Sequence, residues 1–267
     1  MKKVLLSVFV AILIAIPTHA ATYNAANRVQ EVGEQLLTKN GISATNIKFT
    51  VVSDTPNNSN FISNKVINVS SAELAFAGND NETASVVAAE IGHIICGHAS
   101  KDKVISLLQS TADTNITTNA SVQTFASNYK TSKQDKEADL IAVNLMVNAG
   151  YNPLALIVVL TKQTATYWDT IIGRPANADK ALNVYDYISY VYPEKLKVGY
   201  GCNEYRTFLA YAENITQLRS SNKKLAAKND KTYAKAKKNT ANKITKFKTR
   251  GGISGWDAVY GLLNGAQ

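Results

Sequence analysis

The stretch EADLIAVNLMVNAGYNP, residues 137–153, has the clearest structural pattern in the chain. Its apolar residues recur every three or four positions, which predicts an amphipathic helix over about 133–149. The core positions of this helix are Ile141, Leu145 and Met146. Gly150 is suited to end the helix, and Pro153 is suited to begin another. The stretch therefore predicts two consecutive helices joined by a tight turn.

A second stretch, AAEIGHIICGH at residues 88–98, has nearly the pattern of a zinc-binding helix. In H-E-x-x-H, two histidines one turn apart bind one zinc ion, and the glutamate is the general base for the metal-bound water. Glu90 and His93 match the glutamate and the second histidine, whereas Ala89 stands in place of the first. Because alanine has no donor atom, the stretch indicates a damaged zinc site, a site rebuilt from other ligands, or a coincidence of residues.

Two nearby side chains are possible substitute ligands. His98 is five residues after His93, so on a continuous helix it would point roughly 140° away, unless the helix breaks at Gly97. Cys96 is three residues after His93, about 60° around the same face, and its sulfur suits zinc. The residues leave open whether either side chain replaces the lost histidine.

Both stretches resemble motifs of the zinc metallopeptidase family that includes the CAAX prenyl endopeptidases, the HtpX-type heat-shock proteases and the periplasmic proteases BepA and LoiP. The family's zinc helix reads roughly H-E-I-[GAS]-H-x-x-x-x-H, against AEIGHIICGH in this chain. Its second motif, E-A-D-x-x-A…M…A-G-Y-[DN]-P, matches residues 137–153 almost fully. The resemblance extends over about 47–218. It implies a helix-dominated α+β fold of the zincin-like metallopeptidase type, with zinc as cofactor and polypeptides as substrates.

The resemblance also implies roles for four residues. Glu90 would be the catalytic general base, and His93 and Glu137 would be zinc ligands. Asp139 would be a carboxylate that orients a ligand imidazole, as supporting residues around metal sites commonly do.

Three family positions depart from the pattern near the expected reaction centre. Besides Ala89, the sequence RPANADK places Arg174 at the position of a family histidine and Lys180 at that of a family arginine. These departures predict a metalloendopeptidase that is weakened or inactive. The alternative is a non-catalytic pseudopeptidase that binds polypeptides, as a chaperone-like module of the cell envelope.

The rest of the chain predicts strands early and helices on both sides of them. β-Branched residues predict strands at 47–52 and 65–70. Capping side chains in GNDNET, residues 78–83, predict the start of the helix that carries residues 88–98. Further helices are expected at about 21–40, 101–110, 153–163, 174–196 and 203–218, and loops at 54–60 and 110–124.

The N-terminus has the features of a secretory signal peptide. Two lysines precede an apolar run that ends at Ile16, and a short segment from Pro17 follows, with the small residue Ala20 at its end. We therefore expect cleavage after residue 20 and a periplasmic or secreted location. An exported chain can form disulfides, but the sequence does not decide between a Cys96–Cys202 bridge and two separate thiols.

The positive charge is concentrated at the C-terminal end. Residues 219–250 contain twelve Lys and Arg against one acid, whereas the rest of the mature chain has 15 basic and 19 acidic residues. We therefore divide the chain into a signal peptide (1–20), a metallopeptidase-like domain (21–218) and a basic tail (219–267). The tail is either a solvated helix or disordered segment without a target, or an attachment to anionic lipid or envelope polymer. Nucleic acid is not expected as a partner, because the chain is exported and the tail has few aromatic residues.

Overall fold

The computed structural model describes residues 23–53, 62, 63, 65–98, 120–163 and 174–255. It shows a helix-dominated α+β fold with one small sheet, which confirms the predicted fold class. The signal peptide expected at 1–20, the loop expected at 54–60 and the helix expected at 101–110 lie outside the described residues. Within them, no helix is both long and apolar enough to cross a lipid bilayer.

The sheet consists of β1 (Lys48–Val52), β2 (Ile62–Ser63) and β3 (Val66–Ser70) in the order β1-β3-β2. Strands β1 and β3 are parallel, whereas β2 is antiparallel to β3. The two longer strands confirm the strands predicted at 47–52 and 65–70. Helix α1 (Ala25–Lys39) packs against β1, and Gly33 lets it approach, since a Cβ there would lie 2.5 Å from the Phe49 ring.

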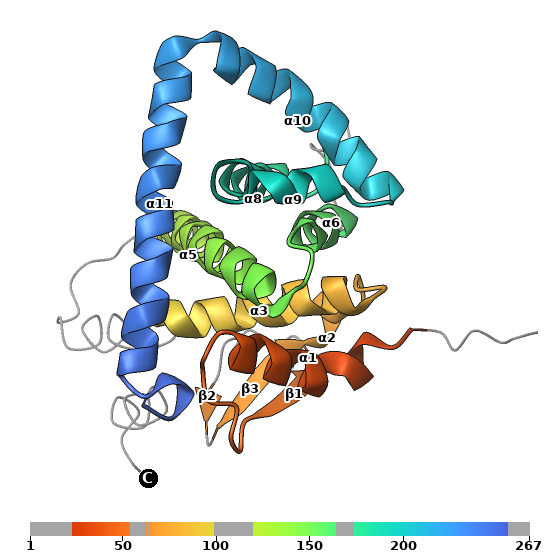
Figure 1. The fold of residues 1–267 in the computed structure, drawn as a ribbon, viewed down its shortest axis with the longest axis vertical. Coiled ribbons are helices and arrows are strands. Elements are labelled where there is room, and N and C mark those ends of the chain that lie inside the picture. Colours follow the sequence, from red (N-terminus) through yellow and green to blue (C-terminus); the bar gives the residue numbers. More distant parts are fainter. Residues whose placement is uncertain (1–22, 54–61, 64, 99–119, 164–173, 256–267) are drawn as a thin grey trace, which may run out of the picture.

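Helix α3 (Asp80–Cys96) carries the first motif and lies beside α1 and the sheet (Figure 1). The Asn79 side chain caps its start by accepting a hydrogen bond from the Glu82 amide, as the sequence GNDNET predicted. Gly97 ends it with a φ of +69°, a left-handed conformation that glycine adopts easily.

Helix α5 (Ala120–Ala149) carries the second motif and crosses α3 closely. Gly92 permits the crossing, because a Cβ at this position would lie 2.5 Å from the Ala138 carbonyl oxygen. The prediction of a loop over 110–124 is wrong for residues 120–124. No glycine or proline occurs between residues 120 and 149 to stop the helix, so it extends further toward the N-terminus than its apolar periodicity does.

The remaining helices pack around this pair. They are α2 (Ser71–Leu74), α6 (Leu154–Lys162), α8 (Ala178–Val191), α9 (Pro193–Val198), α10 (Asn203–Ser221) and α11 (Lys223–Thr249). Helix α6 is almost entirely buried, and α8 packs between α5, α6 and α11. Cys96 is buried and Cys202 half-buried, and both are thiols rather than a disulfide.

Helix α11 runs along one side of the molecule past α8, α5 and α3 (Figure 1). The lysine-rich segment is therefore a helix with one buried face, not a disordered tail. Its buried residues are Tyr233, Thr240, Ile244 and Phe247. The basic C-terminal segment thus belongs to the same hydrophobic core as the motif helices.

Candidate metal centre

The last turns of α3 present the first motif to α5. Glu90 is buried, with 7% of its surface exposed, and His93 is half-buried one turn later. Ala89 is half-buried against the core, and its methyl group contributes no donor. Glu90 and His93 thus lie beside the point where α3 crosses α5 at Gly92. Ala89, at the position of the family's first ligand, lies on the same helix.

The turn at Gly97 brings His98 back over the end of α3. The Gly97 amide donates to the Ile94 carbonyl at 2.9 Å, and the following residue turns inward, so that His98 is only 3% exposed. Its Nδ1 lies 2.9 Å from Nδ1 of His93, and the two rings meet edge to face. The helix does break at Gly97, which is the condition under which His98 could point toward the site.

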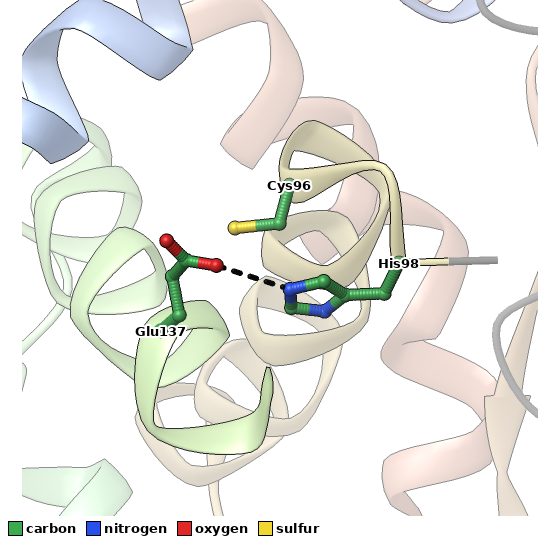
Figure 2. A group of neighbouring side chains, drawn as sticks. All are labelled: Cys96, His98 and Glu137. Atoms are coloured by element: carbon green, nitrogen blue, oxygen red, sulfur yellow. Dashed lines mark hydrogen bonds and ion pairs between the residues drawn. The ribbon is translucent and has the colours of Figure 1, made fainter. Parts of the chain in front are cut away.

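His98 also reaches the second motif helix. Its Nε2 lies 3.3 Å from Oε2 of Glu137 (Figure 2). One imidazole therefore contacts both His93 and Glu137. The other carboxylate oxygen of Glu137, Oε1, accepts a hydrogen bond from the ammonium group of Lys243 on α11. The hydrogen bond from His98, together with Lys243, lowers the pKa of Glu137 to about 2, although partial burial opposes the shift.

Cys96 lies on the same side of the cluster. Its Sγ is 3.8 Å from Nζ of Lys243 and points toward the space between Glu137 and His98 (Figure 2). One donor atom from each of Cys96, His98 and Glu137 lies within 4.8 Å of the other two. The structure therefore brings together both possible substitute ligands and one of the two ligands that the resemblance implied.

His93 has a second partner on α5 that the sequence analysis missed. Oδ1 of Asp135 lies 3.6 Å from Nε2 of His93, while Oδ2 lies 3.3 Å from Nζ of Lys180. Asp135 is two residues before Glu137, so on α5 it faces a different side, toward α3 and α8 rather than α11. The imidazole of His93 is thus held between His98 and Asp135.

Asp139 is one turn after Asp135 and is 3% exposed. Its Oδ2 has no hydrogen bond among the described residues, and its nearest cation is the ammonium group of Lys180 at 4.0 Å. Burial raises the pKa of Asp139 to about 7, although Lys180 opposes the shift. Burial of Lys180 acts to lower its pKa, but Asp139 and Asp135 outweigh that influence, and the pKa is raised.

The two other substituted family positions have different surroundings. Lys180 lies at this cluster through its pairing with the carboxylates of α5. Arg174 pairs instead with Asp179 and donates from Nε to the Tyr211 hydroxyl at 3.3 Å. The structure thus brings Lys180 into the centre, whereas these two contacts of Arg174 are to α8 and α10.

Two crossed motif helices beside a small sheet, with Glu90 and His93 on one and Glu137 on the other, define a domain of the zincin-like metallopeptidase class. Comparison with protein families bears this out, since the model of Peptidase family M48 matches residues 24–189, more than half of the chain. The chain belongs to this family, whose members are zinc-dependent. No curated protein and no solved structure matches the chain.

The residues at the family's ligand positions do not fit a zinc ion. Position 89 has no donor, and a zinc site needs at least three protein ligands. His93 and Glu137 alone would give a metal at this position only two ligands, and each contacts other side chains instead: His98 and Asp135 for His93, and His98 and Lys243 for Glu137. We therefore derive no hydrolytic step through a metal at this position.

Lys243 is the most informative residue that the sequence analysis did not single out. It lies beyond residues 24–189, the part that the family model matches, yet its ammonium group contacts Glu137 and Cys96. A sequence signal existed, because positions 233, 236, 240, 243 and 247 alternate spacings of three and four along one face of a helix. A lysine within such a seam is placed against the body, unlike its neighbours on α11.

Proposed function

We propose that this protein is an exported member of Peptidase family M48 that has lost peptide-bond hydrolysis at the family's zinc position. Instead of cleaving polypeptides, the protein binds them, as a non-catalytic module of the cell envelope. The observation that carries the proposal is the state of the ligand set: Ala89 has no donor, and Glu137 is engaged by His98 and Lys243. Export rests on the signal-peptide pattern of residues 1–20.

The chemistry of water supports the loss of hydrolysis. A zinc-bound water has a pKa of about 7. Bulk water has a pKa of about 16 and is a poor nucleophile. Glu90 can accept a proton effectively only from water that a cation has already polarised. With two of three family ligands remaining, Glu90 would have no such water at the family position.

The sheet offers a place for an extended polypeptide. The outer edge of β1 is partly occupied, since the Phe49 amide donates to the Gln30 side chain at 2.9 Å. Among the described residues, β2 pairs only with β3, and we propose its other edge as the place where a strand is added. Strand addition of this kind supplies backbone hydrogen bonds without catalysis.

A second candidate is a metalloendopeptidase of reduced activity, and one observation favours it. His98 contacts both His93 and Glu137, so it is placed to replace the missing ligand. Glu90 would remain the general base in that case.

A peptidase assay separates the two candidates. The protein purified after export is incubated with unfolded casein and with quenched fluorescent peptides, beside the Glu90→Gln and Ala89→His variants. The proposal predicts no cleavage above the level of Glu90→Gln, together with casein binding that Glu90→Gln retains. Zinc-dependent cleavage by the unmodified protein that Glu90→Gln abolishes would establish the second candidate instead.

A further inference from the structure

We infer that Cys96, His98 and Glu137 form a binding site for one zinc-like divalent cation, displaced from the family's zinc position toward the end of α3. We further infer that the ammonium group of Lys243 provides the positive charge of this site when no cation is bound. The inference is independent of whether the protein binds polypeptides.

The donor set fits the chemistry of zinc. Zinc binds thiolate sulfur, imidazole nitrogen and carboxylate oxygen, and accepts three protein ligands with a fourth position for water. One donor atom from each residue lies within 4.8 Å of the others. Figure 2 shows a Glu137 oxygen directed toward the His98 ring and the Cys96 sulfur directed toward the Glu137 side of the cluster. Donor atoms around a tetrahedral zinc are roughly 3–4 Å apart, so small side-chain movements would close the site. Two anionic ligands would also balance the charge of a divalent cation.

The contacts of His98 suit a metal on its Nε2. Without a cation, Nε2 donates a hydrogen bond to Glu137 at 3.3 Å. A bound cation would displace that proton, and the remaining ring proton would lie on Nδ1, which is 2.9 Å from Nδ1 of His93. His93 is in turn held by Asp135, whose Oδ1 lies 3.6 Å from its Nε2. Such a chain of supporting residues is what fixes the orientation of metal-bound imidazoles.

In this arrangement His93 has a different role from the one implied by the family. It becomes a positioning residue that orients His98 and does not touch the metal. His93 would therefore keep a use in this protein even though residue 89 is alanine and not histidine.

The ammonium group of Lys243 lies where the proposed cation would lie, next to the ligand atoms of Glu137 and Cys96. Its ammonium group contacts two of the three proposed ligands, the carboxylate of Glu137 and the sulfur of Cys96 at 3.8 Å. A cavity of about 180 Å³ between α5, α8 and α11 adjoins this contact and is lined by Glu137, Asn183, Asn239 and Lys243, among others. The lysine therefore has polar space into which it can move when a cation binds.

The proposed site does not restore the hydrolytic arrangement. Cys96 is six residues after Glu90, about 9 Å along the helix axis and roughly 120° around it. We therefore expect a cation bound to Cys96 to lie beyond the reach of Glu90 as a general base. The site would have a structural or regulatory role.

Cobalt(II) titration tests the inference without reference to activity. Cobalt takes zinc sites, and a cysteine ligand adds a thiolate-to-cobalt charge-transfer band in the near ultraviolet. We expect the exported protein to bind one cobalt with this band, and the Cys96→Ser and His98→Ala variants to bind at least about tenfold more weakly, with Cys96→Ser lacking the band. The matched control Cys202→Ser should behave like the unmodified protein.

Two further variants test the supporting roles. His93→Ala should weaken cobalt binding by about 10–100-fold and keep the charge-transfer band, because His93 only orients a ligand. Lys243→Met should tighten binding about two- to fivefold, whereas Lys246→Met, an exposed lysine on the same helix, should not change it.

Three outcomes would overturn the inference: no cobalt bound by either the unmodified protein or Lys243→Met, cobalt bound without the thiolate band, or equal effects of Cys96→Ser and Cys202→Ser. Peptidase activity that depends on Glu90 would contradict the proposed function but would leave these spectra unaffected. The two proposals can therefore fail separately.

Discussion

The ammonium group of Lys243 lies against the carboxylate of Glu137, although the two residues are 106 positions apart in the sequence. Glu137 belongs to the second motif of the family, whereas Lys243 belongs to a helix that the family model does not cover. The contact therefore joins a helix inside the region that the family model matches to a helix beyond it.

Helix α11 is expected to contribute to the stability of the folded domain. Ile244 and Phe247 are buried by its packing, so Ile244→Ala and Phe247→Ala should each lower the free energy of unfolding by about 2–5 kcal/mol. The exposed Lys246→Ala should change it by less than about 0.5 kcal/mol. Urea denaturation measures all three, and equal small effects would show that α11 does not pack on the body in solution.

Gly97→Ala should destabilise the fold and disturb the cluster. Its φ of +69° is unfavourable for alanine by about 1–2 kcal/mol, and relief of that strain would move His98 away from His93 and Glu137. Thermal denaturation should show the lower stability, and the cobalt titration should show weaker binding. Gly199→Ala, at φ +67° with no atom within 4 Å of an added Cβ, is the matched control. It should lose similar stability and keep its affinity for cobalt.

Asp139 should make the stability of the protein depend on pH between about 4 and 7. Its pKa rises from the ordinary 3.8 to about 7 on folding, because the carboxylate is buried. The protonated form is therefore favoured by folding, so its contribution is complete below about pH 4 and is lost as the pH rises through 7. Asp139→Asn should remove this dependence. The difference in unfolding free energy between the two proteins should change by about 2–4 kcal/mol from pH 4 to pH 8. A difference that is constant with pH would contradict this assignment.

The lysines that α11 presents to solvent predict binding to anionic surfaces. The exposed positions include Lys223, Lys224, Lys228, Lys231, Lys235 and Lys238. Each lysine near an anionic membrane contributes about 1 kcal/mol, and salt screens the attraction. Co-sedimentation with phosphatidylglycerol vesicles should therefore be strong at low salt, weak at high salt and absent with phosphatidylcholine. Binding that ignores both lipid charge and salt would exclude this role.

Much of the fold could be predicted from local patterns. The strands at 47–52 and 65–70, the cap at Asn79 and the turn at Gly150 follow from side-chain chemistry that acts over a few residues. The start of α5 could not be placed, because its polar first turns lack an apolar pattern.

The candidate centre was predictable only in part, for a physical reason. The motifs pointed to Glu90, His93 and Glu137, and the glycine at 97 raised the possibility that His98 turns inward. The contacts of Asp135 with His93 and of Lys243 with Glu137 depend on how α5 and α11 pack against α3. Among many similar lysines, the three-four spacing around Lys243 was the one available signal.

The most direct test of the account is the position of bound zinc, located by anomalous scattering in crystals of the protein grown with zinc. We predict one peak within bonding distance of Cys96 Sγ, His98 Nε2 and a Glu137 oxygen, with bonds of about 2.0–2.3 Å. A peak bound by His93 and Glu137, with Glu90 facing its water, would contradict the account and identify the centre as a rebuilt peptidase site.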